Sequence, residues 1–108
     1  MFQQDEMETP VIFRKWKDGD VIALFPAELG TYDRHTCSSY EHVGQHGAAD
    51  PRHVIASTKP ATAVEYWALK SELESAPYGY RLKAYRRMQR SFDVARQNQL
   101  RALESTYE

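Results

Sequence analysis

One uninterrupted apolar run, VIALF at residues 21–25, constrains the fold more than any other feature of this sequence. Successive side chains of a strand point to opposite faces, so the run predicts a central strand that is buried on both faces. Residues 11–16 are β-branched and aromatic, and the Asp18-Gly19 pair between the two runs favours a tight turn because glycine accepts a positive φ. The sequence therefore predicts an antiparallel hairpin of residues 11–16 and 21–25, with Pro26 ending the second strand.

Three further strands are predicted after this hairpin. Residues 36–43 suit a half-exposed strand, and residues 53–58 form a short apolar segment typical of another. Residues 80–88 alternate between apolar and basic side chains, which predicts a strand with one face in water. Residues 44–51 hold two glycines and a proline, so we expect no regular element there.

Two helices complete the predicted elements. Thr62 and Glu65 have the spacing of a capping box, which predicts a helix that runs to about residue 76. Trp67 lies in the apolar stripe of this helix, and we expect it to be the principal core anchor. Residues 91–105 are predicted to form a second helix with a thinner stripe. This C-terminal helix can dock on the sheet, extend away from it or form a homodimer.

The order of these elements predicts an α+β fold. We expect a mostly antiparallel sheet of four to five strands, with one helix packed on a face and a C-terminal helix. Where helices cover the sheet, we expect them on one face only. The 108 residues suit one domain, with a flexible N-terminal tail at residues 1–9, the α+β domain at residues 10–88 and the C-terminal helix at residues 89–108.

Composition favours a small soluble domain of the cytoplasm. The hydrophobic share is 42%, and the single cysteine, Cys37, allows no intramolecular disulfide. The first residues lack the features of a secretion signal, and no apolar run approaches the length of a membrane span, so we expect no membrane contact. No Walker loop or dinucleotide fingerprint is present, and we predict no cofactor.

The densest group of chemically versatile residues lies between His35 and Asp50. The spacing of Cys37, His42 and His46, with Asp50 as a fourth ligand, resembles half of a zinc motif but matches no complete one.

Two other interpretations of the same segment remain open. A thiolate of Cys37 can pair with a histidine such as His53 for nucleophilic catalysis. Alternatively, Cys37 packs in the sheet and the polar loop satisfies its own backbone groups. We predict no metal ion and no catalytic residue here, and we treat the loop as a candidate partner-binding site through His42, Gln45, His46 and Asp50.

A net charge of −1 hides an uneven distribution. Residues 81–101 hold seven arginines and lysines against Asp93 alone. Cations interleaved with aromatic rings are typical of surfaces that meet single-stranded nucleic acid, although the same surface suits an acidic protein or plain solvent. The candidate binding residues of this basic face are Arg81, Lys83, Tyr85, Arg86, Arg87, Arg96 and Arg101.

Four segments carry a resemblance to a known family: FRK at residues 13–15, DGDVIALFP at 18–26, CSSYEHVGQHGAAD at 37–50 and TKPA at 58–61. On these motifs, the chain resembles an uncharacterised family of small proteins from phages, mobile elements and their bacterial hosts. The resemblance implies a genomic setting and no particular chemistry. Small phage proteins often bind a host machine, including defence complexes such as CRISPR effectors.

The sequence as a whole predicts a non-enzymatic interaction protein of phage or mobile-element origin. We expect its partner to be a host protein complex, and inhibition of a CRISPR effector complex is the specific hypothesis. The alternative is nucleic-acid binding through the basic face of the last strand and the C-terminal helix. An enzyme built on Cys37 is the least favoured hypothesis.

Overall fold

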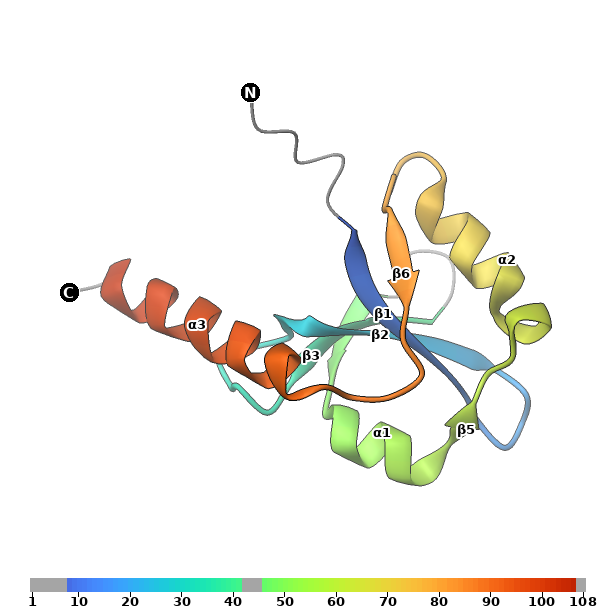
Figure 1. Cartoon of the computed structure of the whole chain (residues 1–108), viewed down its shortest axis with the longest axis horizontal. Coiled ribbons are helices and arrows are strands. Elements are labelled where there is room, and N and C mark those ends of the chain that lie inside the picture. The colour runs from blue at the N-terminus through green and yellow to red at the C-terminus, as the bar shows by residue number, and fades with distance from the viewer. Residues whose placement is uncertain (1–7, 42–45, 107–108) are drawn as a thin grey trace.

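The computed structural model describes residues 8–41 and 46–106, which form one sheet with three helices packed around it (Figure 1). Within these residues the strand order is β4-β3-β2-β1-β5, and β6 also pairs with β1. The fold is α+β, as the sequence predicts. The elements are β1 (Thr9–Lys15), β2 (Val21–Leu29), β3 (Cys37–Tyr40), β4 (His46–Ala49), α1 (Pro51–Ser57), β5 (Lys59–Pro60), α2 (Ala63–Glu74), β6 (Leu82–Ala84) and α3 (Arg90–Thr106).

The predicted hairpin is confirmed. β1 and β2 pair antiparallel, the Trp16 amide donates to the Asp20 carbonyl over 2.8 Å, and Gly19 has a φ of +98°. β2 lies between β1 and β3, and the residues of its apolar run are buried or half-buried. The prediction that Pro26 ends this strand is wrong. β2 continues to Leu29 through a register shift, and a bulge of this kind tolerates a proline because the regular ladder is interrupted there.

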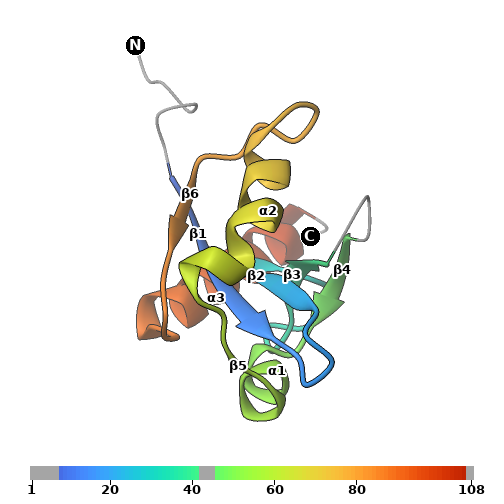
Figure 2. The same ribbon diagram turned by 90° about the vertical axis from the view of Figure 1, so that its right-hand side faces the viewer.

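β1 has two different partners along its outer edge. Its first residues pair in parallel with β6, and its last residues pair antiparallel with β5 (Figure 2). Residues 1–7 of the predicted tail lie outside the described residues, and Thr9 already pairs with Leu82. The strand predicted at residues 80–88 is regular only over Leu82–Ala84, and residues 85–89 form a linker to α3.

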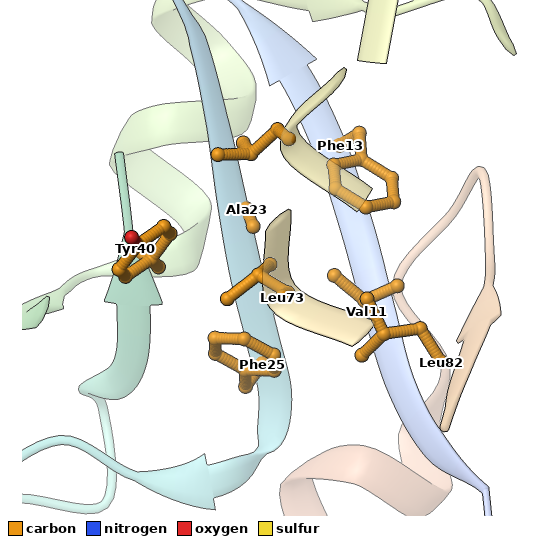
Figure 3. Close-up of a cluster of buried hydrophobic side chains, with 8 residues drawn as sticks. Val11, Phe13, Ala23, Phe25, Tyr40, Leu73 and Leu82 are labelled. Carbon is orange, nitrogen blue, oxygen red and sulfur yellow. The ribbon is translucent and has the colours of Figure 1, made fainter. Parts of the chain in front are cut away.

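Two apolar clusters lie on opposite faces of the sheet, which corrects the expectation that helices cover one face only. The first cluster lies under α2 (Figure 3), and the second lies under α1 and α3. The continuous apolar run of β2 sends side chains to both faces, and each face must be removed from water. The first cluster comprises Val11, Phe13, Ala23, Phe25, Tyr40, Leu69, Leu73 and Leu82, and the second comprises Ile12, Ile22, Leu24, Cys37, Val54 and Phe92.

The structure reverses the predictions for two neighbouring segments. Residues 53–58, predicted as a strand, lie mainly in α1, whereas part of the predicted irregular segment forms β4. The Asp50 side chain accepts a hydrogen bond from the Arg52 amide over 3.0 Å and thereby caps α1. Pro51 follows in the first turn, where its missing N–H leaves no intrahelical bond unmade. These two signals outweigh the β-branched residues that follow.

α2 begins at the predicted capping box, and both halves of the box are present. The Glu65 amide donates to Thr62 Oγ1 over 3.3 Å, and the Thr62 amide donates to Glu65 Oε1 over 2.9 Å. The helix buries Leu69 and Leu73 rather than Trp67, whose side chain is 65% exposed. The prediction of Trp67 as the core anchor is therefore wrong. Two apolar stripes run along this helix, and only the one that contains the leucines faces the sheet.

α3 both docks and extends. Its first half packs on β2 through Phe92 and Arg96, which are buried, whereas residues 101–105 are exposed and project beyond the sheet (Figure 1). Gln99 fastens the helix to the bulged end of β2: its Nε2 donates to the Ala27 carbonyl and its Oε1 accepts from the Leu29 amide, each over 2.9 Å. In the described part of the chain, no helix is long and apolar enough to cross a membrane.

Candidate functional site

Of the cysteine–histidine candidates, the structure describes Cys37, His46 and His53, and they differ in exposure. Cys37 is fully buried in β3, and burial raises the pKa of its thiol to about 12. The thiol is therefore protonated at neutral pH, which supports the structural interpretation of this residue. His53 is exposed on α1 and His46 is exposed on β4, where its ring lies 4.6 Å from that of Tyr40.

Two other residues of that loop, His42 and Gln45, lie outside the described residues. Within residues 8–41 and 46–106, no three side chains of His, Cys, Asp or Glu come together as ligands for a metal ion. Asp50 caps α1, so its carboxylate has a structural role beside any role in binding a partner.

The predicted basic face does not persist as one face of a strand. β6 ends at Ala84, and the Tyr85 ring packs edge-on against Phe92 with 5.1 Å between ring centroids. Arg81 is exposed just before β6, Lys83 is exposed within it, and Arg101 is exposed on the far half of α3. The candidates of the basic face are thus distributed over three places instead of one stripe.

Arg96 is the clearest departure from the sequence prediction. Its side chain is buried, with 4% exposure, and all of its bonds go to the protein itself. Nε donates to the Arg34 carbonyl over 2.9 Å, and the guanidinium also bonds the Pro26 carbonyl and the Asp93 carboxylate. Arg96 therefore joins α3 to β2 and to the loop that follows it, and we leave it out of the proposed binding surface.

Five other exposed arginines line two hollows beside α1. A hollow of about 410 Å³ is lined by Arg34 from the β2–β3 loop, Arg52 from α1 and Arg90 from α3. A second hollow, of about 560 Å³, is lined by Arg52 again and by Arg86 and Arg87 from the linker before α3. Figure 1 shows this linker passing the first turn of α1.

These hollows adjoin one another through shared lining residues. The first and second share Arg52 and Met88, and the second shares Pro60 and Arg86 with a third hollow of about 370 Å³. Tyr66 and Tyr85 line the third hollow. We call the three hollows together the arginine groove, and its cations are Arg34, Arg52, Arg86, Arg87 and Arg90.

The positive charge of the groove is not neutralised by the part of the protein that the structure describes. None of its five cations forms an ion pair with a described residue. Of the two acids in the first hollow, Asp93 pairs with Arg96 and Asp50 caps α1. Arg14, buried beneath the second hollow, has a pKa that burial lowers and that the nearby charge of Arg86 lowers further. The groove is therefore a region of net positive charge.

The other side of the sheet has the opposite character. A hollow of about 410 Å³ beside α2 is lined by Asp20, Glu41, Glu65 and Glu72. Glu65 is paired with Lys15 and with its own capping box. The small net charge of the chain thus hides two hollows of opposite character, one rich in arginine and one rich in acids.

A scan against protein-family models, a search of curated proteins and a search of solved structures each find no match to this chain.

Sequence reasoning missed Arg34, Arg52 and Arg90 as members of a binding surface. They lie in three segments far apart in the sequence, and none belongs to an alternating or helical stripe of charge. Only the docking of α1 and α3 on the same face of the sheet brings them together. The sequence offers only a weak signal for this surface: each of the three arginines lies near a proline, glycine or serine at the end of a helix or strand.

Proposed function

We propose that this protein is a non-enzymatic interaction protein of phage or mobile-element origin, which binds a negatively charged partner in the arginine groove. One observation carries the proposal: five exposed arginines from three separate segments line two adjoining hollows without an ion pair to a described residue. Like charges repel one another, so a partner that brings negative charge gains from all five at once.

The state of the single cysteine supports binding rather than catalysis. A catalytic thiol must be accessible and easily deprotonated, whereas Cys37 is fully buried and burial raises its pKa to about 12. The paired acids of the groove, Asp50 and Asp93, are already bonded within the protein.

The resemblance of residues 13–87 to small phage and mobile-element proteins supports a host complex as the target. A CRISPR effector complex is the specific candidate. Such complexes hold a guide RNA and its target in positively charged channels, so they offer negative charge that an arginine-rich surface can meet.

The test is capture of a partner from host lysate by the full-length protein. The double substitution Arg86→Glu, Arg87→Glu reverses charge in the middle of the groove, and we expect it to abolish capture. The double substitution Lys17→Glu, Arg101→Glu makes the same change of charge at exposed positions outside the groove, and we expect it to retain capture. Equal capture by both variants and by the parent protein would show that the groove is not the interface.

A further inference from the structure

We infer that the component bound in the arginine groove is a single nucleic-acid strand. The inference rests on the proposed function, because it takes the same groove as the interface and names what fills it. It shares Tyr85, Arg86 and Arg87 with the sequence-based alternative. The rest of the surface differs, because it is built from the β2–β3 loop, α1 and the first residue of α3 rather than from β6 and the far half of α3.

The shape of the groove suits a linear polymer. Its three hollows follow one another, with Arg52 and Met88 shared at the first junction and Pro60 and Arg86 at the second. A small anion would need one enclosed pocket, whereas a chain of hollows offers repeated sites along a path.

The first two hollows provide the chemistry for a phosphate backbone. The guanidinium group presents a fork of N–H donors that matches two phosphate oxygens, and it stays charged at every physiological pH. The five groove arginines lie along both hollows, so successive phosphates along a strand can each find a cation. Counterions released from those phosphates add to the affinity.

The third hollow provides the chemistry for bases. Tyr66 and Tyr85 line it from two separate segments of the chain, since Tyr66 belongs to α2 and Tyr85 to the linker before α3. Both rings are already fixed: Tyr66 stacks on Phe13 with 4.2 Å between centroids, and Tyr85 packs edge-on against Phe92. Fixed aromatic rings are stacking platforms for unpaired bases, because every base has a π-face.

A single strand fits this surface better than a duplex or an acidic protein. Readout of a duplex needs a protruding element that enters a groove of the DNA, and the positive charge here lies in a depression. An acidic peptide would satisfy the arginines but would gain little from the aromatic end. Nucleic acid is favoured because the first two hollows of the groove are lined by arginines and the third is lined by tyrosines.

The experiment is fluorescence anisotropy on the full chain with four probes of similar length: labelled oligo-dT, oligo-U, a mixed-sequence DNA duplex and a polyglutamate peptide. We expect the two single strands to bind most tightly, with log affinity falling against log salt concentration by a slope of about −3 if most of the five arginines meet phosphates. Arg86→Glu, Arg87→Glu should weaken this binding about tenfold or more and lower the slope, whereas Lys17→Glu, Arg101→Glu should leave the slope unchanged.

A second variant tests the stacking platform separately from the charge. Tyr85→Leu should weaken binding of oligo-dT about ten- to a hundredfold at constant salt, whereas Tyr85→Phe should retain it. Circular dichroism confirms that each variant is folded. Equal binding by the leucine and phenylalanine variants would overturn the assignment of base stacking to this ring.

The outcomes separate this inference from the proposed function. Capture of a nuclease-resistant partner that depends on Arg86 and Arg87, without binding of any oligonucleotide at low salt, overturns the inference and leaves the proposed function standing. Tighter binding of polyglutamate or of the duplex than of the single strands also overturns it. Absence of both capture and oligonucleotide binding contradicts the inference and the proposed function together.

Discussion

The two faces of the sheet are covered by different means. α2 lies over the first face and buries Leu69 and Leu73 in an apolar cluster. α1 and α3 lie over the second face. They contact the sheet through apolar residues such as Val54 and Phe92 and also through hydrogen bonds of buried arginines. Both faces have an apolar cluster, and the difference lies in the polar contacts. Among the described residues, the second face uses two buried arginines, Arg14 and Arg96, whereas the α2 side uses partly exposed pairs such as Lys15 with Glu65.

Arg14 shows how the second face is fastened. From β1, its Nε donates to Thr58 Oγ1 over 2.9 Å, and its Nη2 donates to the carbonyls of Ile55 and Thr58 over 2.9 and 2.7 Å. These carbonyls lie at the end of α1, where no further helical N–H is available to them. Arg14 thus joins α1 to the sheet by hydrogen bonds from β1, just as Arg96 joins α3 to β2.

The largest effect is expected from Leu73→Ala on the α2 side. Leu73 is fully buried in the first cluster, and its truncation removes apolar contacts and leaves a cavity. We expect the free energy of unfolding to fall by about 3 kcal/mol. Urea unfolding followed by circular dichroism measures this, and a loss below about 1 kcal/mol would show that α2 is not the main cover of that face.

Arg96→Met tests the contribution of hydrogen bonds to the face that α1 and α3 cover. The methionine fills similar space but leaves the Pro26 and Arg34 carbonyls without their donor. We expect a loss of about 2 kcal/mol in the free energy of unfolding. Arg101→Met on the exposed half of the same helix is the matched control, and equal stability of the two variants would contradict the role assigned to Arg96.

Thr62→Ala measures how much the N-cap of α2 contributes to the stability of the fold. The substitution removes the hydroxyl that accepts the Glu65 amide. We expect a loss of about 1 kcal/mol, which is typical of an N-cap. Thr62→Ser is the control because serine keeps the capping oxygen, and it should stay close to the parent protein in the same unfolding experiment.

The capping box also predicts a small dependence of stability on pH. The hydrogen bond from Lys15, together with those from Thr62, lowers the pKa of Glu65 from 4.5 to about 2. A carboxyl whose pKa is lower in the folded state stabilises the fold above its unfolded pKa, and that stabilisation is lost as pH falls from about 4.5 to about 2. Glu65→Gln should make the thermal midpoint of unfolding depend less on pH over this range than it does in the parent protein. Parallel plots of midpoint against pH for the two proteins would contradict the lowered pKa of Glu65.

The smallest effect is expected from Trp67→Ala. Trp67 is on the outer stripe of α2 and is 65% exposed, and its neighbour on that stripe, Val64, is 90% exposed. We expect the free energy of unfolding to change by no more than about 0.5 kcal/mol, as for most surface substitutions. A loss comparable to that of Leu73→Ala would reverse the orientation of α2 and with it the comparison between the two faces.

Local signals predicted the hairpin and α2 because each depends on neighbours in the sequence. Asp18-Gly19 fixes its turn through one residue with a positive φ, and Thr62 with Glu65 fixes a helix start. The same pattern could not choose between the leucine stripe and the tryptophan stripe of α2. That choice depends on which side chains interlock with Phe13 and Phe25 across the sheet.

Long-range contacts explain most of what the sequence did not predict. Arg96 has the composition of a surface residue, and its partners are backbone carbonyls that no side-chain pattern encodes. The arginine groove is likewise a product of the tertiary fold. Its cations come together because the segment at residues 53–58, predicted as a strand, folds as part of α1 and packs beside the linker to α3.

The pairing of β1 with β6 has a consequence for the order in which the chain folds. Thr9 pairs with Leu82, so most of the chain must be in place before this ladder closes. Contacts that join distant parts of a chain form late, because the entropy of a long loop is lost before the contacts compensate for it. The linker that carries Arg86 and Arg87 follows β6 directly. We therefore expect the groove to be among the last parts to be completed, and a chain that stops before β6 leaves the first residues of β1 open to pairing with other chains.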